Sequence, residues 1–117
     1  MHEMSYMVAL VKEALEYCDE NHIDGEKVDT VRVEVGEMTG VLPEFLYKYY
    51  PDVIRDTVLA GSRLDVAQMP VEIECATCRG HYHPEAENGY ACPHCHGKDG
   101  SIIKGRECTL SSLTLKE

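Results

Sequence analysis

Residues 63–78, RLDVAQMPVEIECATC, join an alternating apolar pattern to a C-x-x-C pair, and this junction decides the fold. Apolar side chains occupy even positions up to Val66 and odd positions from Val71 onward, so the alternation slips once. Such alternation is typical of a half-buried β-strand. Pro70 stands at the slip, where a bulge or an edge position tolerates proline. We therefore predict a strand over residues 63–75.

The C-terminal segment shows the mirror pattern, with apolar residues on even positions through Leu110 and on odd positions from Leu113. An antiparallel arrangement brings the two slips to the same height. We therefore expect one long antiparallel pair between residues 63–75 and 107–116, whose tip carries residues 76–106. In this register Leu64 meets Leu115, Val66 meets Leu113, Val71 meets Leu110, and Ile73 meets Cys108, which makes Cys108 a strand residue and not a metal ligand.

Three elements are expected before this pair. Residues 4–22 carry apolar side chains, including Cys18, at the spacing of an amphipathic helix. Residues 28–37 alternate strictly and predict a half-buried strand. A second helix is expected from Pro43 to about Asp56, and Pro51 should kink it or split it.

The expected tip contains CATC, thirteen intervening residues and then CPHC. Four thiolates in two such pairs can close a tetrahedron around Zn²⁺, because each short turn presents two sulfurs to one point. Short strands around 80–83 and 90–91, with a turn at Asn88 and Gly89, would make this a small zinc ribbon. Disulfides, an iron–thiolate site and thiol redox chemistry are the alternatives. The proposed zinc ligands are Cys75, Cys78, Cys92 and Cys95.

Zinc held by four protein ligands has no open position for water, so its role is structural. The module has few large apolar side chains, and metal binding would supply its folding free energy. The predicted class is α+β, with two helices on a small three-stranded sheet and an inserted zinc-ribbon-like module. We expect one domain from residues 1–74 plus 107–117 and a zinc module from residues 75–106.

Four histidines lie in this module: His81, His83, His94 and His96. One interpretation places them on the surface or behind the sulfur ligands. In the other, some exchange with cysteines as ligands or respond to pH, because imidazole titrates near neutrality. The spacing does not distinguish these interpretations.

Composition and charge exclude several classes of function. The chain has 117 residues and a formal net charge of −10, and residues 1–74 carry 16 acidic and 6 basic side chains. Without a basic surface, neither nucleic acid nor an anionic membrane is an expected partner. No apolar run is long enough to span a bilayer, and the first residues lack the pattern of a signal peptide. We expect a cytoplasmic protein with reduced thiols, whose partners are proteins or cations.

The first two residues form a candidate metal site. The Met1 α-amine, the His2 backbone nitrogen and His2 Nδ1 can bind one ion through fused five- and six-membered chelate rings. Square-planar nitrogen ligation suits Ni²⁺ or Cu²⁺. Histidine at position two leaves one in-plane position vacant, as is useful in a protein that passes its metal on.

MHEMS at the start, VRVEVGEMTGVLPEFL in the middle, and the CATC and CPHC pairs together resemble the HypA/HybF family of hydrogenase nickel-incorporation proteins. The resemblance covers nearly the whole chain. It implies a nickel-binding α/β domain with a zinc domain inserted near the C-terminal strand. In this family an uninterrupted second helix is usual, so Pro51 is a departure.

The resemblance also implies site residues and partners. His2 corresponds to a nickel ligand, and Glu3 to a neighbour that ligates or tunes the ion. The four paired cysteines correspond to structural zinc ligands. A HypB-type GTPase and the large subunit of [NiFe]-hydrogenase are the implied partners, with urease served by some relatives. The oligomeric state is left open.

The leading hypothesis is a nickel metallochaperone that binds Ni²⁺ at its N-terminus and delivers it during [NiFe]-hydrogenase maturation. A zinc-ribbon adaptor between proteins, without a nickel function, is the main alternative. A thiol oxidoreductase that uses a C-x-x-C pair is the third. The sequence shows no nucleophile–base pair, so we do not expect an enzyme.

Overall fold

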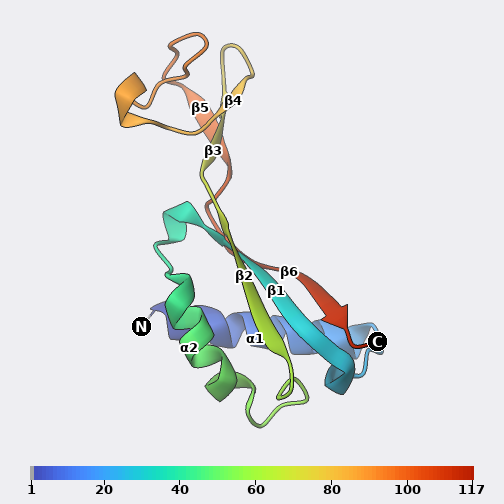
Figure 1. Ribbon diagram of the computed structural model, residues 1–117. Coiled ribbons are helices and arrows are strands. Elements are labelled where there is room, and N and C mark those ends of the chain that lie inside the picture. Colours follow the sequence, from blue (N-terminus) through green and yellow to red (C-terminus); the bar gives the residue numbers. More distant parts are fainter. Residues whose placement is uncertain (1) are drawn as a thin grey trace.

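A computed structural model describes residues 2–117, and only the backbone of His2. Met1 lies outside the described residues. The strands form two three-stranded sheets, in the orders β2-β1-β6 and β4-β3-β5. Figure 1 shows the second sheet extending from one end of the first. The helices and strands are α1 (His2–Glu20), β1 (Val28–Gly36), α2 (Pro43–Ile54), β2 (Arg63–Met69), β3 (Glu72–Cys75), β4 (His81–Tyr82), β5 (Gly100–Lys104) and β6 (Cys108–Leu115).

The first sheet is mixed, with β1 in its centre. β1 pairs in parallel with β2 and antiparallel with β6. Parallel neighbours need a crossover connection, and the segment that contains α2 supplies it between β1 and β2. The prediction of a strand over residues 28–37 is confirmed by β1.

The expected direct pairing of residues 63–75 with 107–116 is wrong. β2 and β6 run in opposite directions, but β1 lies between them, and residues 72–75 pair with β5 instead. Two strands that flank a common central strand show the same mirrored pattern as direct neighbours, because both turn their apolar side chains to the same core. The pattern therefore revealed the relative direction of the strands but not their neighbours.

Both helices are present, with bounds that differ from those expected. α1 begins at His2, two residues before the predicted start, and ends at Glu20. α2 continues through Pro51, so the predicted split does not occur. Proline removes one helical hydrogen bond. Tyr50 and Ile54, on either side of Pro51, are both buried in the core and anchor this part of the helix.

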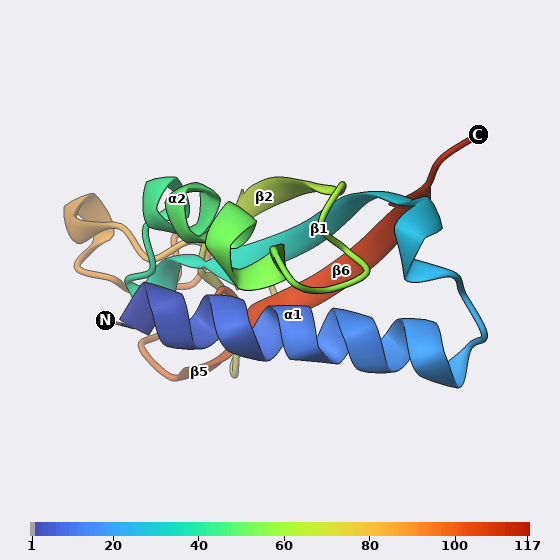
Figure 2. The same ribbon diagram turned by 90° about the horizontal axis from the view of Figure 1, so that it is seen from below.

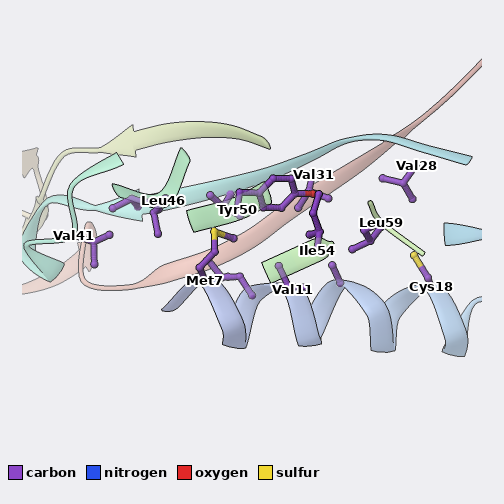
Figure 3. Packing of buried hydrophobic residues seen from close by; sticks show 14 residues of the cluster. Met7, Val11, Cys18, Val28, Val31, Val41, Leu46, Tyr50, Ile54 and Leu59 are labelled. Carbon is purple, nitrogen blue, oxygen red and sulfur yellow. The ribbon is translucent and has the colours of Figure 1, made fainter. Parts of the chain in front are cut away.

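The main hydrophobic core lies between the helices and one face of the first sheet (Figures 2 and 3). Met7 and Val11 of α1 meet Leu46 and Tyr50 of α2 there, and Cys18 is buried at the far end, as predicted. Val31, Val33 and Val35 provide the sheet side of this core. We call α1, α2, β1, β2 and β6 the α/β body.

Residues 72–104 form the second unit, which we call the cysteine module. β3 pairs antiparallel with β4 on one side and with β5 on the other. The predicted strand near 80–83 exists as β4, but residues 90–91 form a turn and not a strand. A short 3₁₀ helix, η3 (Ala86–Asn88), precedes that turn and ends at Gly89 in the left-handed conformation.

One hydrogen-bonded cluster links the body to the module. Glu37 lies in the 3₁₀ helix η2 (Glu37–Thr39), directly after β1. Its Oε1 accepts a hydrogen bond of 2.8 Å from the Val71 backbone N–H and lies 2.9 Å from His83 Nε2. We call Glu37, Val71 and His83 the junction cluster.

Candidate metal centre

The cysteine module brings four sulfur atoms to one point. The Sγ atoms of Cys75, Cys78, Cys92 and Cys95 all lie within 4.8 Å of one another. Cys75 and Cys92 are buried, and Cys78 is exposed. Within the residues described, this is the group of side chains that could hold a metal ion, and Cys18 and Cys108 are not part of it.

The sulfur spacing fits a tetrahedral metal site. Cys75 Sγ lies 3.5 Å from Cys95 Sγ, and Cys78 Sγ lies 3.6 Å from Cys92 Sγ. A Zn²⁺ ion with bonds of about 2.3 Å to four sulfurs gives tetrahedron edges of about 3.8 Å. A disulfide needs about 2.05 Å. Both close pairs join one C-x-x-C to the other, as a shared ion requires. The four-cysteine cluster therefore fits a structural zinc site.

The two C-x-x-C segments fold into the same turn. In the first, Cys75 N–H donates to the Gly80 carbonyl at 2.9 Å, and Arg79 N–H donates to the Cys75 carbonyl at 3.0 Å. In the second, Cys92 N–H donates to the Gly97 carbonyl at 2.9 Å, and His96 N–H donates to the Cys92 carbonyl at 2.8 Å. The centre is thus built from two copies of one local structure.

The last two positions of each turn explain its shape. Arg79 has φ 64° and His96 has φ 62°, so each turn passes through the left-handed region just after its second cysteine. A glycine follows in both cases. A Cβ on Gly97 would lie 3.3 Å from Cys95 Sγ and 3.6 Å from Cys75 Sγ. Glycine therefore lets the backbone come close to the sulfur cluster.

Backbone N–H groups make part of the centre favourable for thiolate. Hydrogen bonds from the N–H groups of Cys78 and Thr77 lower the pKa of the Cys75 thiol to about 6. The N–H of Gly97 acts in the same direction on Cys95, but neighbouring Cys75, burial and the other two cysteines outweigh it and raise the pKa of Cys95 to about 11. Four thiolates at this spacing repel one another, and a divalent cation relieves that repulsion.

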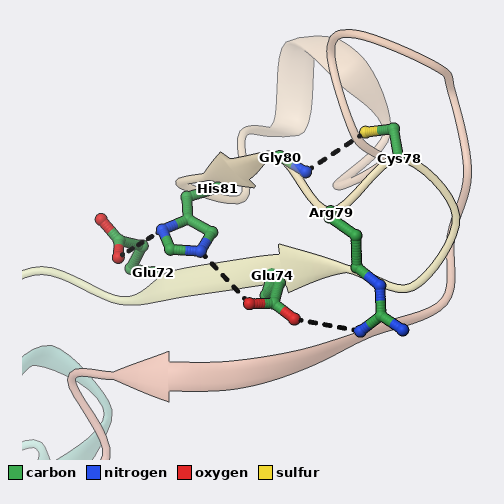
Figure 4. Close-up of polar contacts among 6 residues, drawn as sticks. All are labelled: Glu72, Glu74, Cys78, Arg79, Gly80 and His81. Atoms are coloured by element: carbon green, nitrogen blue, oxygen red, sulfur yellow. Dashed lines mark hydrogen bonds and ion pairs between the residues drawn. The ribbon is translucent and has the colours of Figure 1, made fainter.

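Two of the four histidines of the module contact carboxylates. His81 lies between two carboxylates of β3, 3.3 Å from Glu72 and 3.3 Å from Glu74 (Figure 4). His83 Nδ1 lies 2.9 Å from Glu85, and its Nε2 reaches Glu37 in the body. None of the four histidines belongs to the metal-compatible group found among the described residues.

The structure describes only part of the predicted nickel site, which consists of Met1, His2 and Glu3. Met1 and the side chain of His2 lie outside the described residues. His2 is the first residue of α1, and Glu3 lies in its first turn. The structure does not test nickel binding by these residues, which stays a prediction.

Two features of the site escaped the sequence analysis. The first is the repeated pattern C-x-x-C-x-G, which covers residues 75–80 and 92–97. Reading two residues beyond each cysteine pair would have revealed it. The second is the junction cluster, whose members are far apart in the chain and carry no common signal in the sequence.

Together, a four-cysteine site on a zinc-ribbon-like module and a body of two helices on a mixed sheet define a small α+β metal-binding protein. No helix in the described part of the chain has the length and apolar character needed to cross a bilayer.

Comparison with known proteins identifies the family. Residues 1–115 match the family model HypA, described as hydrogenase/urease nickel incorporation, metallochaperone. The chain therefore belongs to the HypA family of nickel metallochaperones, and the resemblance seen in the sequence is confirmed.

Individual relatives agree over the full length. The chain is 32% identical over 117 residues to the hydrogenase maturation factor HypA of Desulfosudis oleivorans, with all of both chains covered. It is 31% identical to that of Methanothermobacter thermautotrophicus, covering all of this chain and 98% of the relative. The solution structure of the Ni metallochaperone HypA from Helicobacter pylori matches with a TM-score of 0.69 at 26% identity, covering 97% of each chain.

Proposed function

We propose that this chain binds Ni²⁺ at its N-terminus and delivers the ion during the maturation of [NiFe]-hydrogenase. The family match over residues 1–115 supports the class of function. The position of α1 is the observation that supports the site, because the helix begins at His2 and has Glu3 in its first turn.

The start of a helix suits a metal that is bound through backbone nitrogen. The first four N–H groups of a helix have no acceptor within it, so His2 can give up its amide proton without breaking a helical hydrogen bond. The positive end of the helix dipole favours the deprotonated nitrogen. Met1 amine, His2 backbone nitrogen and His2 Nδ1 would then hold Ni²⁺, and Glu3 would complete or tune the site.

The four cysteines have a different role in this proposal. Cys75, Cys78, Cys92 and Cys95 hold Zn²⁺ and keep the cysteine module folded. The domain bounds that we propose are those predicted from the sequence, with residues 75–106 as the zinc domain and residues 1–74 plus 107–117 as the nickel-binding domain. Four protein sulfurs leave no position for a substrate or a transferred ion. Separate donor sets keep the exchangeable metal away from the structural one.

Delivery proceeds by ligand exchange. The open position on nickel accepts a ligand from a partner, for which we propose a HypB-type GTPase, and the cysteines of the hydrogenase large subunit then take the ion. The net charge of −10 favours cations and a basic partner surface. The chain acts here as a carrier in the cytoplasm and not as an enzyme.

Nickel titration of the zinc-loaded protein tests this proposal. We expect about one tightly bound Ni²⁺ per wild-type chain, and a loss of affinity of about tenfold or more in His2→Ala and in N-terminally acetylated protein. His22→Ala is the matched control, because His22 lies just beyond the opposite end of α1. Equal nickel affinity in all four proteins would refute the proposed site and leave the adaptor alternative.

A further inference from the structure

The two edges of the first sheet differ in how they are protected. β2 is one edge strand and carries the charged residues Arg63 and Asp65. β6 is the other edge strand, and its eight residues, CTLSSLTL, include no charge and no proline. Charged residues and prolines normally prevent an exposed edge from pairing with another chain. β6 lacks both, although the chain as a whole is strongly charged.

The sequence around β6 is complementary to itself. Residues 106–117 read RECTLSSLTLKE, whose centre, TLSSLT, is a palindrome. When two copies run antiparallel about the point between Ser111 and Ser112, like residues meet in the middle and opposite charges meet outside. The resulting pairs are Leu110 with Leu113, Thr109 with Thr114, Cys108 with Leu115, Glu107 with Lys116, and Arg106 with Glu117.

The residues of β6 that this register pairs turn their backbone N–H and C=O groups away from β1, as hydrogen bonding to a second copy requires. Gly36 N–H donates to the Glu107 carbonyl, and Lys116 N–H donates to the Lys27 carbonyl, so residues 107 and 116 both face inward. Residues alternate between the two sides of a strand. Counting from each end, the outward backbone groups belong to Cys108, Leu110, Leu113 and Leu115.

The irregularity in the middle of β6 makes this count possible. Val33 pairs with Leu110 and Arg32 pairs with Ser112, which leaves Ser111 as an extra residue. Without this extra residue, the backbone N–H and C=O groups of one member of each palindromic pair would point away from β1 and those of the other toward it. With the extra residue, the backbone groups of Leu110 and Leu113 both point away from β1 and can exchange hydrogen bonds with their counterparts in a second copy.

The side chains on the helix side of β6 also fit a second copy. Leu110 and Leu113 pack against the main core from this edge. Beside them lies a groove of about 460 Å³ between α1 and β6. Tyr17 and Leu115 in its wall are each 48% exposed, which is a large exposure for such apolar side chains. Lys116 donates to the Glu26 carbonyl in its own chain and retains two further N–H donors for Glu107 of a second copy.

We propose that β6 is a homodimer interface, in which two copies of this chain pair their β6 strands antiparallel about a two-fold axis between Ser111 and Ser112. The β2-β1-β6 sheets of the two copies then become one continuous sheet of six strands, with the four helices of the dimer on the same face. The interface is isologous, as a two-fold dimer requires. It does not depend on nickel or on the proposed N-terminal site.

Two double variants that differ at one position test the register. Thr109 and Thr114 are exposed and face each other across the proposed axis. Thr109→Lys with Thr114→Lys places like charges opposite each other twice, and we expect the dimer dissociation constant to rise by about tenfold or more. Thr109→Lys with Thr114→Glu places opposite charges there and should retain the dimer. Gln68→Lys, on the β2 edge, should have no effect.

Sedimentation velocity of the zinc-loaded full chain, from about 10 µM to about 1 mM, gives the dissociation constants. We expect wild type to approach twice its 13.1 kDa mass at the high end. Amide hydrogen exchange at both concentrations locates the interface. The amides of Cys108, Leu110, Leu113 and Leu115 should exchange more slowly at high concentration, while those of Thr109 and Thr114 should be protected at both.

Three results would overturn the proposal. A wild-type chain that stays monomeric at about 1 mM has no such interface. A dimer that is equally stable in both double variants uses another surface. A dimer without concentration-dependent protection of the four outward amides pairs elsewhere, for example through an exchanged cysteine module.

Discussion

The α/β body and the cysteine module reach a folded state by different means. In the described residues the body buries fourteen hydrophobic side chains in one cluster, most of them from both helices and the central strand, with Val41 and Leu59 from the segments beside α2. The corresponding cluster of the module consists of Cys75, Tyr82 and Cys92, so two of its three members are proposed metal ligands. Apolar burial at this scale can hold the body together, but it cannot do so for the module.

This difference suits the two regions to two kinds of metal site, one for a permanent metal and one for an exchangeable metal. A module whose fold depends on its ion must keep that ion, so it suits a permanent structural metal. A body that is stable through its own core can bind and lose an ion at its end without unfolding. A protein that carries a metal needs the second property, and we propose that the body uses it at the start of α1.

The largest expected effect is the loss of the module when zinc is removed. Metal binding contributes on the order of 10 kcal/mol to sites of this kind. A strong chelator, or Cys92→Ser, should therefore collapse the amide spectrum of residues 75–97 and leave the signals of the body in place. Two-dimensional NMR measures both regions at once.

Cys108→Ser is the control for this experiment, because Cys108 lies in β6 outside the sulfur cluster. It should retain zinc and a folded module. If the module kept its dispersed spectrum without metal, or if the body unfolded with it, the contrast between the two regions would be incorrect.

The second effect concerns the body alone. Leu46 is fully buried between α2 and the rest of the core. Truncating it to alanine removes apolar contacts and leaves a cavity, which typically costs about 2–5 kcal/mol. Leu46→Ala should lower the free energy of unfolding of the body in urea by that amount without changing the zinc content. Leu42→Ala, where the side chain is 47% exposed, should cost less than about 1 kcal/mol.

The third effect is at the connection between the two regions. Gly105 has φ +90°, and a Cβ there would lie 2.7 Å from Val71 Cα. Gly105→Ala combines backbone strain with a steric clash, so we expect a loss of about 1–3 kcal/mol in thermal or urea unfolding. Gly89→Ala is the matched control, because φ is +61° but nothing lies within 4 Å of its Cβ. Equal effects of the two variants would show that the close approach at the junction is unimportant.

The smallest effect is the pH dependence of the junction cluster. Glu37, followed by Glu85, raises the pKa of His83. The stability that protonated His83 contributes is therefore complete below about pH 6.5 and is lost as the pH rises through the raised pKa. Hydrogen bonds from the Val71 N–H and then from His83 lower the pKa of Glu37, and its contribution is lost as the pH falls through that lowered value. The link is therefore strongest at mildly acidic pH.

An NMR titration of the His83 ring measures this link. Glu37→Gln removes the first of the two charges that raise the pKa of His83, so the pKa should fall toward its usual range. Glu34→Gln is a control, because Glu34 has no contact with His83 among the described interactions. An unchanged titration in Glu37→Gln would mean that the side chains of the junction do not form a pair in solution.

Sequence patterns predicted the elements of this fold better than their neighbours. Alternation located β1, β2 and β6, and helical spacing located α1 and α2. The direct pairing of β2 with β6 was wrong, because the mirrored patterns encode a shared core and not a shared ladder. The order strand, helix, strand over residues 28–69 is typical of a parallel pair and would have corrected it.

The candidate sites also differ in how well the sequence predicted them. The spacing of the two cysteine pairs was enough to predict the sulfur cluster, because each pair is local and only the fold between them was unknown. The contact of Glu37 with His83 joins residues 46 positions apart and depends on how the module meets the body. No local pattern contains that information.

X-ray absorption at both metal edges, on the chain loaded with one zinc and one nickel, shows whether the two metals occupy separate sets of donor atoms. We expect four sulfur donors around zinc, and nitrogen and oxygen donors without sulfur around nickel. Sulfur in the nickel shell, or a zinc shell short of four sulfurs once nickel is added, would contradict this separation, because the two metals would then share the cysteine module.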